Sequence, residues 1–140
     1  MIERCNKNNR DKIISVVENK RTFRIKNNSS FDINKVKVDG CYILEGTKCD
    51  YLFEIINNKI IEQVFYVELK GSNITHAIEQ LESTILHCNI IHNSIKYKKC
   101  YIVASRYPSS GQSSQILKTK FKKKNNIQLF FDSKIKEVTL

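Results

Sequence analysis

The chain has 140 residues, enough for a single domain with a buried core over residues 1–140 and too few for two comfortable domains. Its 41% hydrophobic and 27% charged residues argue against wholesale disorder. No stretch approaches the roughly 20 apolar residues that cross a bilayer, and residues 1–7 contain neither a hydrophobic signal core nor an amphipathic presequence. We therefore expect a soluble, cytoplasmic protein with no membrane partner.

Positive charge is the most informative bulk property. Lys and Arg number 24 against 14 Asp and Glu, which gives a formal net charge of +10. The excess is concentrated, because no Asp or Glu occurs between Ser83 and Phe131. A field of one sign attracts polyanions, since neutralising phosphates releases their condensed counterions. The charge favours a nucleic acid partner; the alternative is a lysine-rich solvated surface.

The cysteines are far apart and form no Cys-x-x-Cys pair. An odd count in a chain without a secretion signal predicts reduced, mostly buried thiols. The alternative is a structural zinc site completed by His76, His87 and His92, but the spacing of zinc ligands is missing. The five positions are Cys5, Cys41, Cys49, Cys88 and Cys100.

Hydrophobic periodicity gives the elements expected in the N-terminal half. Residues 11–20 carry a short amphipathic pattern, which predicts a first helix. Asn57-Asn58-Lys59 has turn chemistry and predicts a hairpin between the second and third of the strands that follow. Those three strands are expected at 36–44, 49–56 and 60–69.

In the C-terminal half, helices and strands are expected to alternate. A helix capped by Asn73 or Thr75 should run to about His87, because its apolar residues are spaced three and four apart. We then expect a buried strand at 100–104, a loop at 105–114, a basic helix at 115–124 and a strand at 127–131. This order predicts an α/β fold in which helices flank both faces of a mixed central sheet.

The third predicted strand carries an acid and a base on one face. Side chains alternate along a strand, so Glu68 and Lys70 point to the face opposite Leu69. Asp50 begins the preceding, otherwise apolar strand. A loop centred near Lys59 would pair Asp50 with Glu68, whereas a tighter turn would offset them and require a bulge.

Two carboxylates and an ammonium group on one patch are suited to phosphodiester hydrolysis. Mg²⁺ or Mn²⁺ takes oxygen ligands, and it polarises a phosphate and lowers the pKa of a bound water. Lys70 would orient that water and offset charge that develops in the transition state. The alternative is a weak solvated ion pair on an exposed strand.

The residues Cys49-Asp50-Tyr51, Val67 to Gly71 and Glu79-Gln80-Leu81 together resemble the PD-(D/E)xK nuclease superfamily, which includes many restriction endonucleases. The resemblance implies the restriction endonuclease-like αβββαβ core across nearly the whole chain. It implies that Asp50 and Glu68 are metal ligands, that Lys70 is the catalytic lysine and that Gln80 faces the active site. It also makes Glu18, on the predicted first helix, a weaker candidate for the site.

The remaining site candidates are basic or local to the motif. Asp39 is expected to serve a turn or bulge, with a place near the site as the alternative, and His76 to lie on a helix surface. The residues expected to bind phosphates are Arg106, Lys118, Lys120, Lys122, Lys123 and Lys124.

The function expected from these features is Mg²⁺-dependent DNA hydrolysis, with RNA as a further substrate to be tested. A chain this small would act as a homodimer or as a subunit of a larger defence or repair complex. The competing interpretation is a noncatalytic nucleic-acid-binding or partner-docking module on the same fold.

Overall fold

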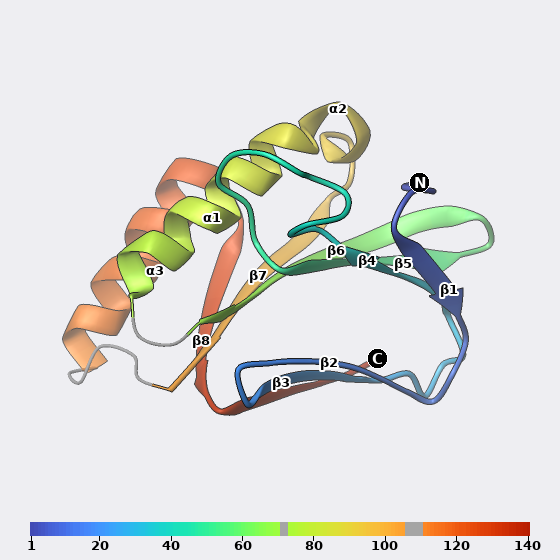
Figure 1. Cartoon of the computed structure of the whole chain (residues 1–140), viewed down its shortest axis with the longest axis horizontal. Coiled ribbons are helices and arrows are strands. Elements are labelled where there is room, and N and C mark those ends of the chain that lie inside the picture. Colours follow the sequence, from blue (N-terminus) through green and yellow to red (C-terminus); the bar gives the residue numbers. More distant parts are fainter. Residues whose placement is uncertain (71–72, 106–110) are drawn as a thin grey trace.

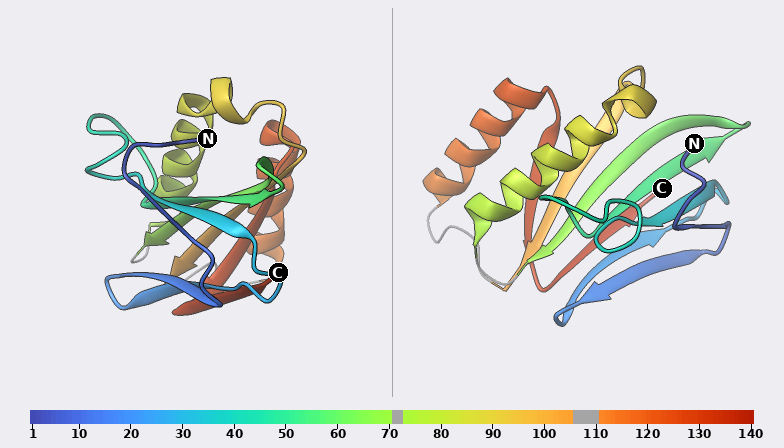
Figure 2. Two further views of the ribbon diagram at one scale, coloured as in Figure 1. Left: turned by 90° about the vertical axis from the view of Figure 1, so that its right-hand side faces the viewer. Right: turned by 45° about the horizontal axis from the view of Figure 1, so that its top comes forward.

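A six-stranded sheet lies between a layer of helices and a smaller, three-stranded sheet (Figures 1 and 2). The structure is a computed structural model and describes residues 1–70, 73–105 and 111–140. Within these residues, the helices are α1 (Ile74–His87), α2 (Asn89–His92) and α3 (Gly111–Asn125). None of the described helices is both long and apolar enough to cross a membrane.

The large sheet is mixed, with the strand order β1-β4-β5-β6-β7-β8. Neighbours are antiparallel from β1 to β6 and parallel from β6 to β8. Its strands are β1 (Asn6–Asn9), β4 (Asp32–Lys37), β5 (Tyr51–Asn57), β6 (Ile60–Lys70), β7 (Tyr97–Ala104) and β8 (Gln128–Ser133). The small sheet has the order β2-β3-β9, formed by β2 (Ile13–Glu18), β3 (Arg21–Lys26) and β9 (Ile135–Thr139).

The prediction of a first helix over residues 11–20 is wrong. These residues form β2 and the start of a hairpin whose turn, Asn19-Lys20, has positive φ angles of 49° and 63°. Burial alternates along β2, with Val16 5% exposed and Val17 59% exposed, which is the period of a strand. The positions of the four β-branched residues in this segment fit the period of a helix as well as that of a strand. β-Branched side chains themselves favour a strand.

Among the residues that the structure describes, helices cover one face of the large sheet alone, so the prediction of helices on both faces is also wrong. The small sheet occupies the opposite face, as both views in Figure 2 show. The predicted strand at 36–44 is replaced by β4, which ends at Lys37, and by a loop over residues 38–49. The helix α3 begins at Gly111, inside the predicted loop; residues 106–110 of that loop lie outside the described residues.

Other sequence predictions are confirmed. The chain is an α/β protein with a mixed sheet, and β5 and β6 form the expected hairpin. The helix α1 ends at His87, and the Asn73 side chain caps it by accepting a hydrogen bond from the backbone N–H of His76 at 3.0 Å. The buried strand β7 and the final strand of the large sheet, β8, also form where expected.

Both faces of β6 are buried, each against a different layer. Phe65, Val67 and Leu69 face the small sheet, whereas Tyr66 and Val64 face the helices. Phe23 of β3 is fully buried in the core between the two sheets, and its ring centroid lies 4.9 Å from that of Tyr101. The alternation expected for Glu68 and Lys70 therefore places them on the helix-covered face of the sheet.

A buried polar network fixes α2 and the N-terminus on this same face. His92 Nε2 lies 2.6 Å from Glu54 Oε2, and His92 Nδ1 lies 2.8 Å from the Tyr66 hydroxyl. Glu54 Oε1 accepts hydrogen bonds from Asn34 Nδ2 and from the backbone N–H of Ile2. Burial alone would raise the pKa of Glu54, but the hydrogen bonds from His92, Asn34 and Ile2 outweigh it and lower the pKa.

Substitutions at two neighbouring valines of β2 distinguish the observed strand from the helix predicted for the same residues. Val16→Ala should cost about 2 kcal/mol, because it removes two methyl groups from the core between the sheets. Val17→Ala should change the free energy of unfolding by less than about 0.5 kcal/mol, since Val17 faces solvent. Urea denaturation measures both; equal losses would contradict the strand.

Candidate active site

A bulge in the β5–β6 hairpin sets which residues meet at its open end. Asn57 pairs with Ile60 around the two-residue turn Asn58-Lys59, which alone would bring Asp50 opposite Val67. The register shifts by one residue between Ile56 and Ile55, so that Tyr51 pairs with Val67. Continued by one residue, this register places Asp50 opposite Glu68.

Asp50 and Glu68 are buried together, 9% and 2% exposed. The backbone N–H of Leu69 donates a hydrogen bond to Asp50 Oδ2 at 2.9 Å and fixes that carboxylate. Glu68 Oε1 is buried without a hydrogen-bond partner among the residues that the structure describes. Burying a carboxylate oxygen without a hydrogen-bond partner costs free energy. A cation or a proton bound at this oxygen would lower that cost.

Burial is the largest cause of the raised pKa values of both carboxyl groups. Burial raises the pKa of Asp50 to about 6, helped by the charges of Glu18 and Asp39 and opposed by the hydrogen bond from Leu69. Burial also raises the pKa of Glu68 to about 8; the charge of Asp50 adds to this, and the ammonium group of Lys70 opposes it. Asp50 and Lys70 thus both lie close enough to Glu68 to shift its pKa.

The helix α1 holds the chain that leads into Asp50. Gln80 Nε2 donates to the Lys48 carbonyl at 3.0 Å, and Thr84 Oγ1 accepts from the backbone N–H of Cys49 at 2.8 Å. Gln80 Oε1 is buried and, within the described part of the chain, has no hydrogen-bond partner. Gln80 therefore holds the chain two residues before Asp50. Thr84 supports the same segment, and the sequence analysis did not identify it.

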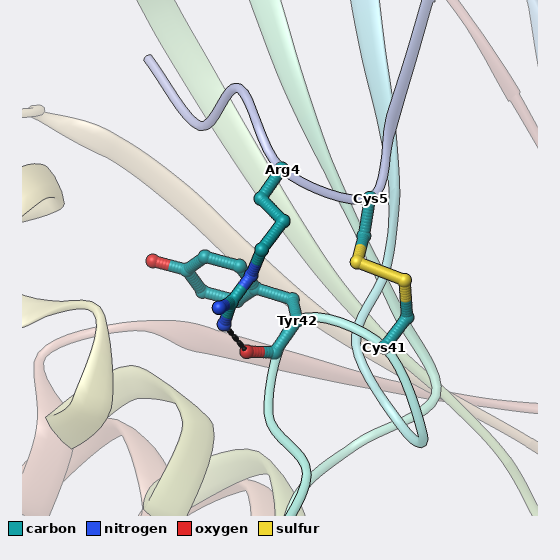
Figure 3. Close-up of a disulfide and its surroundings, with 4 residues drawn as sticks. All are labelled: Arg4, Cys5, Cys41 and Tyr42. Atoms are coloured by element: carbon teal, nitrogen blue, oxygen red, sulfur yellow. Dashed lines mark hydrogen bonds between the residues drawn. A yellow bond between two sulfur atoms is a disulfide. The ribbon is translucent and has the colours of Figure 1, made fainter.

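The disulfide Cys5–Cys41 ties the loop over residues 38–49 to the N-terminal segment (Figure 3). The prediction that all cysteines are reduced is wrong for this pair. The odd number of cysteines in the sequence could not reveal that two of them form a disulfide. The Arg4 guanidinium group lies over the Tyr42 ring, 5.5 Å from its centroid, and donates to the Tyr42 carbonyl. The other three cysteines are free and buried, as expected. The loop that delivers Asp50 is therefore fixed at both of its ends.

Two acidic candidates lie close to the pair without joining its hydrogen bonds. Glu18 comes from the end of β2 rather than from a helix, and its carboxylate lies 3.7 Å from Lys37 Nζ. Asp39 follows β4 in the loop, as its expected turn role implies, and lies 3.8 Å from Lys48 Nζ. Lys48 is a further cation beside the site that the sequence analysis did not single out.

The histidines are dispersed and form no zinc site. His76 lies at the surface of α1, 3.6 Å from Glu79. His87 contacts the Tyr42 ring, and His92 belongs to the buried network. Across residues 1–70, 73–105 and 111–140, no group of three or more His, Cys, Asp and Glu side chains is arranged to hold a metal.

The lysines of α3 divide between two faces. Lys118, Lys122 and Lys123 line a groove of about 580 Å³ between α3 and β8, together with Gln128 and Phe130. This groove has no acidic residue among its lining residues, which suits a phosphate backbone. The last turn of α3 nevertheless lies at the end of the sheet opposite to the end of β6 (Figure 1).

Lys120 and Lys124 lie on the other side of α3, toward α1. Lys124 Nζ lies 3.2 Å from Glu82 Oε2, so this lysine already has an intramolecular partner. Arg106, the remaining predicted phosphate ligand, lies outside the described residues. Among the described residues, the structure therefore does not gather the predicted lysines of α3 around Asp50 and Glu68.

Comparisons with protein-family models, with curated proteins and with solved structures gave no match. The function proposed for this chain therefore rests on its own residues and their geometry.

Neutralising Glu68 should change how stability depends on pH. The folded-state pKa values of Asp50 and Glu68 are raised, so ionising these groups favours the unfolded chain. Without metal, the melting temperature should fall as the pH rises from about 4 to about 8. Glu68→Gln should remove much of this fall and raise the melting temperature near pH 8 by roughly 3 °C or more, which corresponds to about 1 kcal/mol.

Glu45→Gln is the matched control, because Glu45 is an exposed carboxylate in the loop that leads to Asp50. Its melting profile should follow that of the wild type at each pH. A Glu68→Gln profile with the wild-type slope would show that the buried pair does not determine this pH dependence.

Proposed function

We propose that the chain is a metal-dependent nuclease that hydrolyses phosphodiester bonds in DNA. The observation that carries the proposal is the buried pair Asp50 and Glu68, with one carboxylate oxygen unpartnered and Lys70 beside it. A polar group buried without a partner costs stability, and buried, perturbed carboxyl groups cluster at functional sites. The pair is better explained by a ligand that it binds than by a structural role.

The donor set suits Mg²⁺ or Mn²⁺. Asp50 and Glu68 offer carboxylate oxygens, Gln80 has a buried, unpartnered amide oxygen close by, and no histidine or thiolate joins them within the described residues. Mg²⁺ is commonly held by one or two carboxylates and keeps waters or phosphate oxygens as its other ligands. When bound, the metal would supply Lewis acid chemistry at the phosphate and a water of lowered pKa.

The chain's own residues would divide the remaining tasks. Asp50 is held by the backbone N–H of Leu69, so its carboxylate is oriented before any ligand arrives. Lys70 would donate to a phosphate oxygen or to the attacking water and offset the negative charge that develops in the transition state. Gln80 would act as a positioning residue, through its hydrogen bond to the Lys48 carbonyl.

The strand order adds support from the fold. From β4 to β7 the chain runs through three strands, α1, the four-residue helix α2 and a strand. Apart from α2, this is the order within the PD-(D/E)xK core after its first helix. The first helix of that core has no counterpart here, because β2 and β3 occupy its place in the sequence. The proposal therefore rests on the site and on this partial agreement.

A noncatalytic nucleic-acid-binding module is the second candidate. It is favoured by the raised pKa of Glu68, because a protonated Glu68 beside an ionised Asp50 is stable without any metal. Metal binding separates the two candidates, since a module has no need of it.

Mn²⁺ should stabilise the wild-type protein, and more strongly near pH 8 than near pH 6, because both carboxyl groups must lose their protons to bind it. At a Mn²⁺ concentration of about ten times Kd, the gain is about 1.4 kcal/mol, or roughly 4 °C in melting temperature. Glu68→Gln should lose this gain and Glu45→Gln should retain it. Equal gains in all three proteins would favour the module.

Lys70→Ala should reduce cleavage of DNA by at least about 100-fold, because Lys70 acts on the transition state. The melting temperature and the DNA affinity should stay nearly unchanged. The assay follows single-stranded, duplex, branched and RNA substrates with Mg²⁺ and with Mn²⁺, by gel electrophoresis. It is run with and without reductant, since a reducing cytoplasm would open Cys5–Cys41 and release the loop before Asp50.

Lys48→Ala is the control for loss of a lysine at the edge of the site. Lys48 pairs with Asp39, so its replacement should leave most of the cleavage activity in place. Cleavage by Lys70→Ala at the wild-type rate would end the proposed mechanism.

A further inference from the structure

A second set of basic residues lies on the small-sheet side of the molecule, at the end of the large sheet where β6 ends. Lys20 and Arg21 form the tip of the β2–β3 hairpin, and Lys134 connects β8 to β9. No sequence pattern singled them out, because they are isolated along the chain. The small sheet brings them to the end of the large sheet where β6, β7 and β8 end (Figure 1).

Backbone contacts link these residues to Lys70 step by step. Lys70 is the register partner of Ala104, and the Ala104 carbonyl accepts a hydrogen bond from the backbone N–H of Lys134 at 3.0 Å. The Lys134 carbonyl accepts from the backbone N–H of Thr22 at 2.9 Å. Since each paired strand adds about 4.8 Å, the three basic residues lie within a few strand widths of Lys70.

The side chains at this end leave positive charge available. The Arg21 guanidinium group donates to Ser105 Oγ and to the Asn19 carbonyl, so it is held at the end of β7. Lys20 and Lys134 are exposed, and neither has an ion-pair partner among the residues that the structure describes. The nearby acids Glu18 and Asp132 are paired with Lys37 and Lys136.

We propose that Lys20, Arg21 and Lys134 bind the DNA phosphates that flank the scissile phosphate, and so position the substrate over Glu68 and Lys70. This inference rests on the proposed function for the location of the scissile phosphate. It assigns the main substrate contact to the small sheet. The groove beside α3 then contacts phosphates farther along the strand.

The chain contains a close control for Lys20. Asn19-Lys20 and Asn58-Lys59 are both Asn-Lys hairpin turns, and the lysine φ angles are 63° and 64°. Lys59 lies in the β5–β6 turn, at the opposite end of the large sheet. Glycine accepts this left-handed conformation without strain, so Lys20→Gly and Lys59→Gly should leave the melting temperature equal to or slightly above that of the wild type.

The measurement is fluorescence anisotropy with a labelled duplex, single-stranded DNA and RNA, in EDTA so that no cleavage occurs. Lys20→Gly and Lys134→Asn should each weaken DNA binding roughly 3- to 10-fold, and each should lower the slope of log affinity against log salt by about one. Arg21→Lys should weaken binding less than Arg21→Ala, because it keeps the charge. Lys59→Gly should bind within about twofold of the wild type.

Binding by Lys20→Gly and Lys134→Asn that matches Lys59→Gly would overturn the inference, as would binding of RNA alone or of neither nucleic acid. The two proposals fail separately. Lysine-dependent binding without cleavage keeps this surface and removes the nuclease, whereas cleavage and binding unaffected by both substitutions keep the nuclease and remove this surface.

Discussion

The pairing of β5 with β6 is the constraint on which the site depends. A two-residue turn without a bulge would bring Val67, rather than Glu68, opposite Asp50. The single-residue shift at Ile55–Ile56 corrects the register and brings two carboxylates together at the open end of the hairpin. A bulge that disrupts the ladder and buries two carboxyl groups side by side has no evident value for stability. Its consequence is the juxtaposition of Asp50 and Glu68.

The small sheet explains how so short a chain buries β6 on both faces. Helices on one side and β2, β3 and β9 on the other exclude water from Phe65, Val67 and Leu69 as well as from Tyr66. Such double burial makes the surroundings of Glu68 apolar, and this is the main cause of its raised pKa. The same layer carries the Lys20 turn to the end of β6, so burial of the acid and delivery of basic residues have one structural origin.

Sequence reasoning succeeded where one period was unambiguous. The apolar spacing over Ile74–His87 fits only a helix, and the run before Glu68 is too long and too rich in β-branched and aromatic residues for a loop. It failed at Ile13–Glu18, whose paired β-branched residues fit both periods. It missed Arg21–Lys26, because the outward positions of that strand are polar or charged and only Phe23 and Ile25 are buried. Pairing partners decide such segments, and they lie far away in the sequence.

The candidate site was predictable in its residues but not in its surroundings. Asp50, Glu68 and Lys70 follow from parity and position, whereas the bulge, Thr84 and the Cys5–Cys41 bond depend on contacts between distant segments. The resemblance to a nuclease superfamily pointed to Gln80, whose side chain contacts the segment that leads into Asp50. It misplaced Glu18 on a helix, since the small sheet stands where that helix was expected.

The raised pKa values of Asp50 and Glu68 bear on how the folded chain is stable without a ligand at the site. Burial favours the neutral forms of both Asp50 and Glu68, and the pKa of Glu68 is raised further than that of Asp50, so the pair holds a proton more readily than separate, exposed carboxyl groups would. If the proposed site holds a divalent cation, Asp50 and Glu68 would both bind it in their deprotonated forms. The raised pKa values therefore allow the fold to keep two carboxyl groups side by side in its interior.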